Sequence, residues 1–99
     1  MFAARTVNKT AVVGHNVTLI CNSSVERPVV WWFKDQLGTE ETEVVVNGEV
    51  VNGNADRMTL ISHDLVIDKV ISNDSGMYTC VEDTGFGEHH KIFLRVSGY

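Results

Sequence analysis

Two cysteines and the residues around them restrict the fold of this chain more than any other feature. Cys21 and Cys80 lie 59 positions apart, and each falls at the inward phase of a short apolar alternation. Trp32 follows the first cysteine by eleven positions, and Tyr78 precedes the second by two. A fold for this chain therefore has to bring these separate apolar segments to one core.

The rest of the sequence consists of short apolar alternations separated by turn residues, which is the pattern of an all-β sandwich. Asn47-Gly48, between two valine-rich runs, is a strong hairpin signal. No run keeps helical spacing for three turns, and only 72–75 is a candidate for a single helical turn. We expect strands at 17–21, 30–33, 43–46, 49–51, 58–60, 65–67, 77–82 and 91–96.

The segment Asp74-Ser75-Gly76-Met77-Tyr78-Thr79-Cys80, together with Cys21 and Trp32, resembles the signature of the immunoglobulin superfamily. The resemblance covers nearly the whole chain. It implies an all-β, immunoglobulin-like sandwich of two antiparallel sheets, with Greek-key topology and one inter-sheet disulfide. A chain of 99 residues has the length of one domain, so we expect 1–99 to form a single variable-like domain.

The resemblance implies structural roles for its most hydrophobic residues. Cys21 and Cys80 would link the two sheets, and closing a loop of this length removes about 4 kcal/mol of unfolded-state entropy on the chain-entropy model. Trp32 would pack against that bridge, between sheets about 10 Å apart.

The polar residues of the signature have implied roles as well. Tyr78 resembles the tyrosine of the corner motif, whose hydroxyl returns to the backbone near Asp74. Gly76 would allow the tight backbone of that corner. Arg57 stands where the family has the arginine that pairs with this aspartate, and a partly buried bidentate pair would hold that end of the sandwich together. These roles specify the fold and leave the ligand open.

Two subtypes of the family fit the sequence. There is room for a C′ strand at 43–46 and a short C″ strand at 50–51, which indicates a variable-like domain. Phe86-Gly87 resembles the start of the joining-type Phe-Gly-x-Gly motif of antigen-receptor variable domains, but its second glycine position is His89. Gly87-Glu88 also resembles the glycine of intermediate-set adhesion modules. The variable-like interpretation is favoured, and the intermediate set is the alternative.

A protein-binding face is predicted on the strands that the family letters G, F, C and C′. If Trp32 faces the core, strand alternation turns Trp31 and Phe33 to the opposite side of the sheet. Exposed aromatic clusters of this kind generally mark interaction surfaces, and variable-type domains commonly pair through this face. The predicted GFCC′ face consists of Trp31, Phe33, Val45, Thr79, Val81, Phe86 and Phe93. The alternative is that a loop or a neighbouring domain covers the aromatic pair.

Charge and glycosylation motifs restrict the partners. The net charge of -5 argues against nucleic acid, because phosphate backbones are bound by basic stripes and the eight Lys and Arg residues are scattered. No apolar run approaches the ~20 residues that span a bilayer, so direct membrane contact is not expected from this segment. Four Asn-x-Ser/Thr sequons suggest N-glycans and an extracellular chain, secreted or at the cell surface. They begin at Asn8, Asn16, Asn22 and Asn73.

We expect no catalysis, no cofactor and no metal site. The chain lacks a nucleophile elbow, a phosphate loop and paired-carboxylate spacing. His89 and His90 are adjacent on a predicted strand, so they point to opposite faces and cannot ligate one ion within the chain.

The predicted function is recognition by an extracellular domain of an immune-type or cell-surface receptor. Such a domain would bind a protein ligand, or form a homodimer, through the GFCC′ face. The alternative is an intermediate-set-like module of a cell-adhesion or receptor ectodomain, with a mainly structural role as a spacer.

Overall fold

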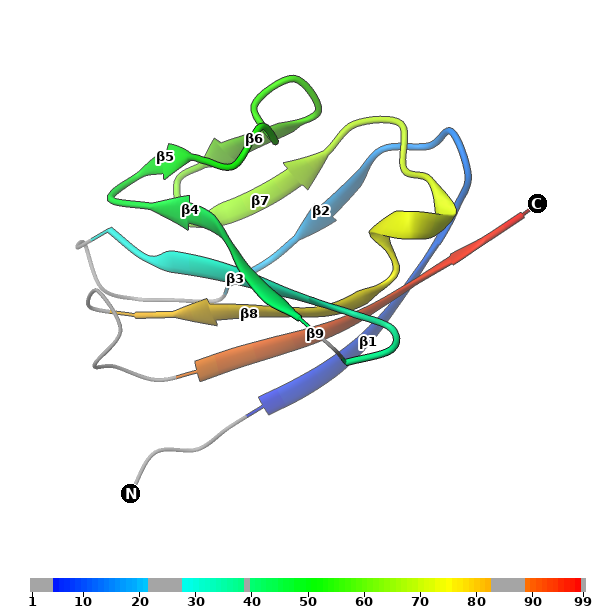
Figure 1. Ribbon diagram of the computed structural model, residues 1–99, viewed down its shortest axis with the longest axis horizontal. Coiled ribbons are helices and arrows are strands. Elements are labelled where there is room, and N and C mark those ends of the chain that lie inside the picture. Colours follow the sequence, from blue (N-terminus) through cyan, green and yellow to red (C-terminus); the bar gives the residue numbers. More distant parts are fainter. Residues whose placement is uncertain (1–4, 22–27, 39, 83–88, 99) are drawn as a thin grey trace.

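The computed structural model describes residues 5–21, 28–38, 40–82 and 89–98 (Figure 1). The 3-10 helix η1 occupies the predicted helical turn. The elements in chain order are β1 (Arg5–Val12), β2 (Val17–Leu19), β3 (Val30–Asp35), β4 (Glu41–Val46), β5 (Glu49–Val50), β6 (Met58–Ile61), β7 (Asp64–Ile67), η1 (Ser72–Asp74), β8 (Gly76–Val81) and β9 (His89–Ser97).

The strands form two sheets packed face to face (Figure 1). One sheet has the order β1-β9-β8-β3-β4-β5, and the other has the order β2-β7-β6. Among the described strands, β1 and β9 run parallel and the other pairs are antiparallel. The predicted immunoglobulin-like sandwich is confirmed. In the family's lettering, β9, β8, β3 and β4 are G, F, C and C′, and β5 takes the place of the short C″ strand.

Strand β1 was not among the predicted strands. Lys9 interrupts its apolar alternation, so no local pattern marks it as half-buried. The parallel pairing with β9 extends over all eight of its residues. Pairing with a distant strand, rather than local sequence, defines this element.

The core lies between the two sheets. Strand β9 contributes Ile92, Leu94 and Val96 at alternate positions, as its predicted alternation requires. The disulfide that the resemblance implied joins Cys21, two residues after β2, to Cys80 in β8, with the two Cα atoms 5.7 Å apart. Each large apolar side chain buried in this layer contributes about 1.5–3 kcal/mol.

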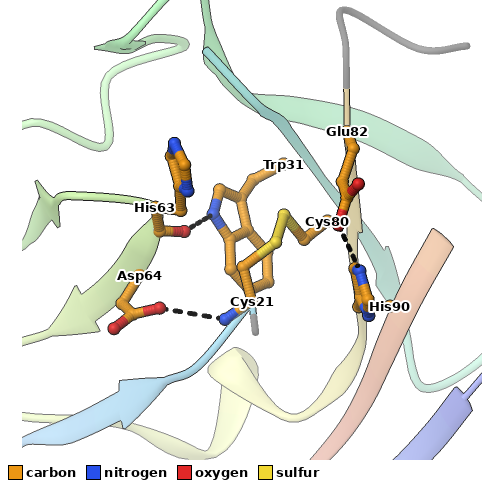
Figure 2. Close-up of a disulfide and its surroundings, with 7 residues drawn as sticks. All are labelled: Cys21, Trp31, His63, Asp64, Cys80, Glu82 and His90. Carbon is orange, nitrogen blue, oxygen red and sulfur yellow. Dashed lines mark hydrogen bonds and ion pairs between the residues drawn. A yellow bond between two sulfur atoms is a disulfide. The ribbon is translucent and has the colours of Figure 1, made fainter. Parts of the chain in front are cut away.

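The tryptophan beside the disulfide is Trp31, so the prediction for Trp32 was wrong (Figure 2). Trp31 is 0% exposed, and its Nε1 donates a hydrogen bond to the carbonyl oxygen of His63, 2.9 Å away. Trp31 is paired with Cys80 in the register of β3 and β8, so both side chains lie on the side of the sheet that faces the core. Residues 30–33 are all apolar, so alternation defines two opposite sides without saying which is inward.

Two other residues of the predicted GFCC′ face, Phe33 and Val45, also point into the core. Phe33 points inward with Trp31, packs against the core, and has its ring centroid 4.7 Å from that of Tyr78. The register of β4 is irregular opposite Trp31, and both Val44 and Val45 are buried there. Such a bulge interrupts the alternation of sides. The predicted outward orientation of Trp31, Phe33 and Val45 was therefore wrong.

Gly76 starts β8 where the chain passes close to the end of β3. A Cβ at this position would lie 2.3 Å from the carbonyl oxygen of Lys34 and 2.7 Å from the ring of Phe33. The corner therefore requires glycine because there is no space for a side chain.

Candidate protein-binding face

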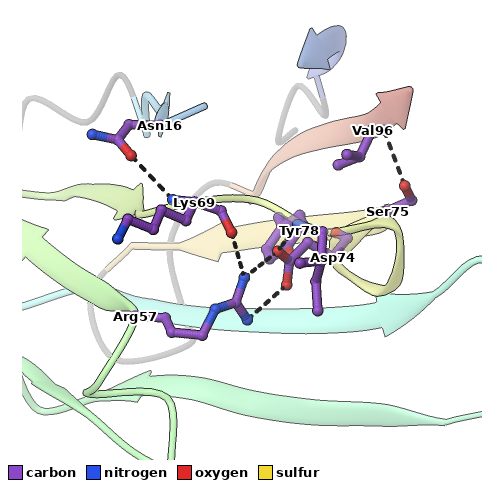
Figure 3. A network of polar contacts seen from close by, with 8 residues as sticks. Asn16, Arg57, Lys69, Asp74, Ser75, Tyr78 and Val96 are labelled. Carbon is purple, nitrogen blue, oxygen red and sulfur yellow. Dashed lines mark hydrogen bonds and ion pairs between the residues drawn. The ribbon is translucent and has the colours of Figure 1, made fainter. Parts of the chain in front are cut away.

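A polar corner surrounds η1 (Figure 3). Tyr78 donates its hydroxyl hydrogen to the carbonyl oxygen of Asp74 at 2.7 Å, and the Asp74 carboxylate accepts a hydrogen bond from the backbone N–H of Ile71 at 2.9 Å. Arg57 contacts the same carboxylate with both terminal nitrogens, and its Nη1 lies 3.2 Å from Oδ1. These polar groups satisfy one another, so the corner stabilises the fold.

Because of this corner, the free energy of unfolding changes with pH in the alkaline range. Burial raises the pKa of Tyr78, the Asp74 carboxylate raises it further, and Arg57 lowers it. The folded chain therefore keeps this phenol protonated above pH ~10, where a tyrosine in the unfolded chain ionises. The unfolded chain then binds fewer protons than the folded chain. The free energy of unfolding therefore falls as the pH rises above about 10, by at most ~1.4 kcal/mol per pH unit from this group.

The variant Tyr78→Phe is expected to lose this contribution. Urea denaturation at a series of alkaline pH values measures the free energy of unfolding for both proteins. The decline above pH ~10 should be shallower in Tyr78→Phe than in the wild type, because phenylalanine has no proton to release. Parallel declines would contradict the assignment to Tyr78.

A second set of polar contacts lies around the disulfide (Figure 2). The backbone N–H of Cys21 donates to the Asp64 carboxylate at 3.0 Å. Glu82 Oε2 lies 2.8 Å from His90 Nε2, and these side chains are 10% and 8% exposed. His90 is buried and His89 is exposed, as expected for neighbours on a strand. Sequence reasoning missed the Glu82–His90 contact, because Glu82 follows β8, His90 lies on β9, and no local pattern links them.

The side of the six-stranded sheet that points away from the three-stranded sheet is its outer face. Three half-buried apolar side chains of this face, Trp32 on β3, Met77 on β8 and Phe93 on β9, form what we call the apolar patch. Met77 and Phe93 are direct neighbours in the register, and Trp32 is a direct neighbour of Thr79. The three side chains of the apolar patch therefore come from three neighbouring strands, and Trp32 lies two residues along β3 from the row that holds Met77 and Phe93. Large aromatic side chains of this kind dominate the energetics of protein interfaces.

The predicted face residues divide into three groups. Thr79, Val81 and Phe93 lie on the outer face, although Thr79 and Val81 are largely covered. Trp31, Phe33 and Val45 lie in the interior. Phe86 lies outside the described residues.

Sequence reasoning missed two members of the apolar patch. Trp32 was missed because the phase of β3 was inverted. The signal for Met77 was present in the sequence, since it shares the phase of Thr79 and Val81 on the same strand.

The sequons lie on different parts of the molecule. Asn8 is exposed on β1, and Asn73 is exposed in η1. Asn16 is exposed just before β2, and its Oδ1 accepts a hydrogen bond from the backbone N–H of Lys69 at 3.0 Å. This bond uses Oδ1 and not Nδ2, the atom that carries a glycan. Asn22 lies outside the described residues.

A small apolar cavity opens between β1 and β2. Its volume is about 200 Å³, below the ~300–1,000 Å³ of pockets that hold drug-sized ligands. It is lined by Val7, Lys9, Thr18, Leu19, Ile20 and Ile92.

Comparison with known proteins agrees with this architecture. The family model described as "Immunoglobulin domain" matches residues 4–83, and the chain belongs to this family. It is 35% identical over 98 residues to neural cell adhesion molecule 1 of Bos taurus, covering 90% of this chain and 10% of that protein. It is 31% identical over 90 residues to hemicentin-1 of Homo sapiens, covering 85% of this chain and 1% of that protein.

Solved structures show the same fold. The N-terminal four immunoglobulin domains of Dscam1 isoform 4.44 match with a TM-score of 0.77 at 23% identity, over 98% of this chain and 24% of that chain. The chain is thus an immunoglobulin domain of the kind found in cell-adhesion and receptor ectodomains. Within the described ranges, no helix is long and apolar enough to cross a membrane.

Proposed function

We propose that this chain is the extracellular recognition domain of a cell-surface or secreted protein, and that it binds a protein partner through the outer face. The observation that supports this most is the apolar patch, which brings two half-buried aromatic residues, Trp32 and Phe93, to an open sheet surface. Interfaces are enriched in aromatic residues and methionine. The likeness to a neural cell adhesion molecule adds support from the family.

We further propose that the domain is variable-like. The support comes from β4 and β5, which extend the sheet beyond β3 as C′ and C″ strands do in variable domains. The alternative is an intermediate-set-like module with a structural role, which would contact its neighbours through its ends and edges.

Replacing Trp32 tests the proposed binding face. We would display a panel of extracellular domains on cells, this chain among them, and measure binding of the tetramerised wild-type chain. Trp32→Ala should weaken each interaction by about 30-fold or more, because a central aromatic anchor contributes about 2 kcal/mol or more. The matched control is Ile61→Ala, which removes a 60% exposed apolar side chain from β6 in the other sheet. Interactions that survive Trp32→Ala and disappear with Ile61→Ala would contradict the proposed face.

Self-association is one form of this binding, and the charges on the outer face favour it. Glu41 and Glu43 lie on β4, whereas Lys91 and Arg95 lie on β9, on the other side of the central strands β3 and β8. A twofold axis parallel to the strands would place β4 of one copy over β9 of the other, with Glu43 near Lys91. An axis across the strands would stack like charges, which is unfavourable.

Charge reversal tests this pairing. Glu43→Lys and Lys91→Glu should each weaken dimerisation by about tenfold in sedimentation equilibrium, because each variant places like charges together twice per dimer. The double variant should recover dimerisation, and so should a mixture of the two single variants. Asp56→Lys, an equal charge change at an exposed position outside the strands, is the control. A double variant no better than the single variants would contradict the pairing.

A further inference from the structure

The sequon at Asn8 lies beside the apolar patch. Strand β1 runs parallel to β9, with Asn8 directly next to Phe93. Ile92 and Leu94, on either side of Phe93 in β9, are buried in the core. Phe93 therefore points outward, and the residue of β1 in register with it shares the outer face.

The residues that flank Asn8 support this orientation independently. Val7 and Lys9 line the cavity between β1 and β2, together with the inward-facing Ile92. Asn8 lies between them on an extended strand and therefore points away from the cavity. Asn8 and Thr10, the two residues that define the sequon, are both exposed.

We propose that Asn8 carries an N-linked glycan that covers the Phe93 side of the apolar patch and thereby limits which protein partners reach the outer face. The regulatory part of this inference rests on the proposed function. In the modification step, Nδ2 of Asn8 loses a proton and forms a bond to C1 of the first sugar. The bond from C1 to the pyrophosphate of a lipid-linked oligosaccharide donor breaks, and the lipid pyrophosphate leaves.

Strand spacing determines which part of the patch the glycan covers. Neighbouring strands are about 4.8 Å apart, so the first sugar stands next to Phe93, with Met77 one strand further. Trp32 lies on β3, three strand spacings or about 14 Å from β1. The glycan therefore shields Phe93 and Met77 most and leaves the β3 side of the patch accessible. Among the sequon asparagines that the structure describes, Asn16 precedes β2 and Asn73 lies in η1, so only Asn8 is on the outer face.

The test compares the accessibility of the patch with and without the glycan. The chain is secreted from mammalian cells as wild type, Asn8→Gln and Asn16→Gln. Peptide mass spectrometry measures occupancy of Asn8, and hydroxyl-radical footprinting measures labelling of Phe93 and Met77. Ile61, exposed in the other sheet, is the internal reference. We expect Asn8 to be glycosylated and labelling of both residues to rise several-fold in Asn8→Gln but not in Asn16→Gln. Thr10→Ala removes the same sequon and should match Asn8→Gln.

An unmodified Asn8, or equal labelling of Phe93 in wild type and Asn8→Gln, would overturn the inference. Binding to the displayed ectodomains tests the regulatory part, and Asn8→Gln should bind more strongly than the glycosylated wild type. Equal binding would overturn that part. Footprinting needs no ligand, so it is independent of the proposed function. If Trp32→Ala abolishes binding while labelling is equal, this inference alone fails. If labelling changes as expected but Trp32→Ala binds normally, the proposed function fails and the glycan site remains.

Discussion

Replacing Trp31 by alanine is expected to lower the free energy of unfolding by about 3–5 kcal/mol, the range for truncating a fully buried aromatic residue. Trp31 is 0% exposed, lies against the disulfide, and donates its indole hydrogen to the carbonyl oxygen of His63. Its removal leaves a cavity in the core and that carbonyl without its donor. Urea denaturation of the oxidised domain measures the loss.

The neighbouring tryptophan is the matched control for this prediction. Trp32→Ala removes the same side chain from the outer face, where it is only half-buried, and should change the free energy of unfolding by about 1 kcal/mol or less. If Trp31→Ala does not fold, Trp31→Phe keeps most of the volume and should cost about 1–3 kcal/mol through the lost hydrogen bond. A larger loss for Trp32→Ala than for Trp31→Ala would show that the phase of β3 is the opposite one.

Removing the disulfide is expected to have an effect of similar size. The double variant Cys21→Ala, Cys80→Ala opens a loop of 59 residues, and the chain-entropy model gives a loss of about 4 kcal/mol. Domains of this size are stable by about 5–15 kcal/mol, so the variant should be close to the limit of folding at body temperature. Chemical denaturation of the wild type and the double variant measures the difference.

Chemical reduction provides a second route to the same state. A thiol reductant should destabilise the wild type by about as much as the double substitution does, because both remove the same cross-link. It should leave the double variant unchanged. A wild type that loses less than about 1 kcal/mol on reduction would contradict the large contribution assigned to the bridge.

Much of the fold could be predicted because its evidence is local. The offset between Tyr78 and Cys80 is set along one strand, where residues two apart share a side. Asn47-Gly48 marks the turn between β4 and β5, and both residues have the positive φ angles, 52° and 78°, that such a turn requires. These features need no knowledge of which strands become neighbours.

The candidate site was predicted less well, because it depends on the phase of each strand. Thr79 was placed on the correct side because Tyr78 and Cys80 flank it. Phe93 was placed on the correct side because Lys91 and Arg95, two residues away on either side, are polar. Trp31 and Trp32 were exchanged, because β3 is apolar at every position from 30 to 33. Glu82 and His90 were not paired, because their contact joins the residue that follows β8 to a residue of β9, and no pattern in either segment marks it.

The sequence by itself determined the immunoglobulin sandwich, its disulfide and the turn between β4 and β5. The sandwich and the disulfide follow from the resemblance to the immunoglobulin superfamily that the two cysteines and the segment 74–80 carry, and the turn follows from Asn47-Gly48. The tertiary structure decided which tryptophan is in the core, the bulge that buries Val44 and Val45, and the pairing of β1 that places Asn8 beside Phe93. These features depend on register between strands far apart in the chain. A shift of one residue in that register exchanges the two sides of a strand. When both sides are apolar, the sequence pattern is compatible with either arrangement.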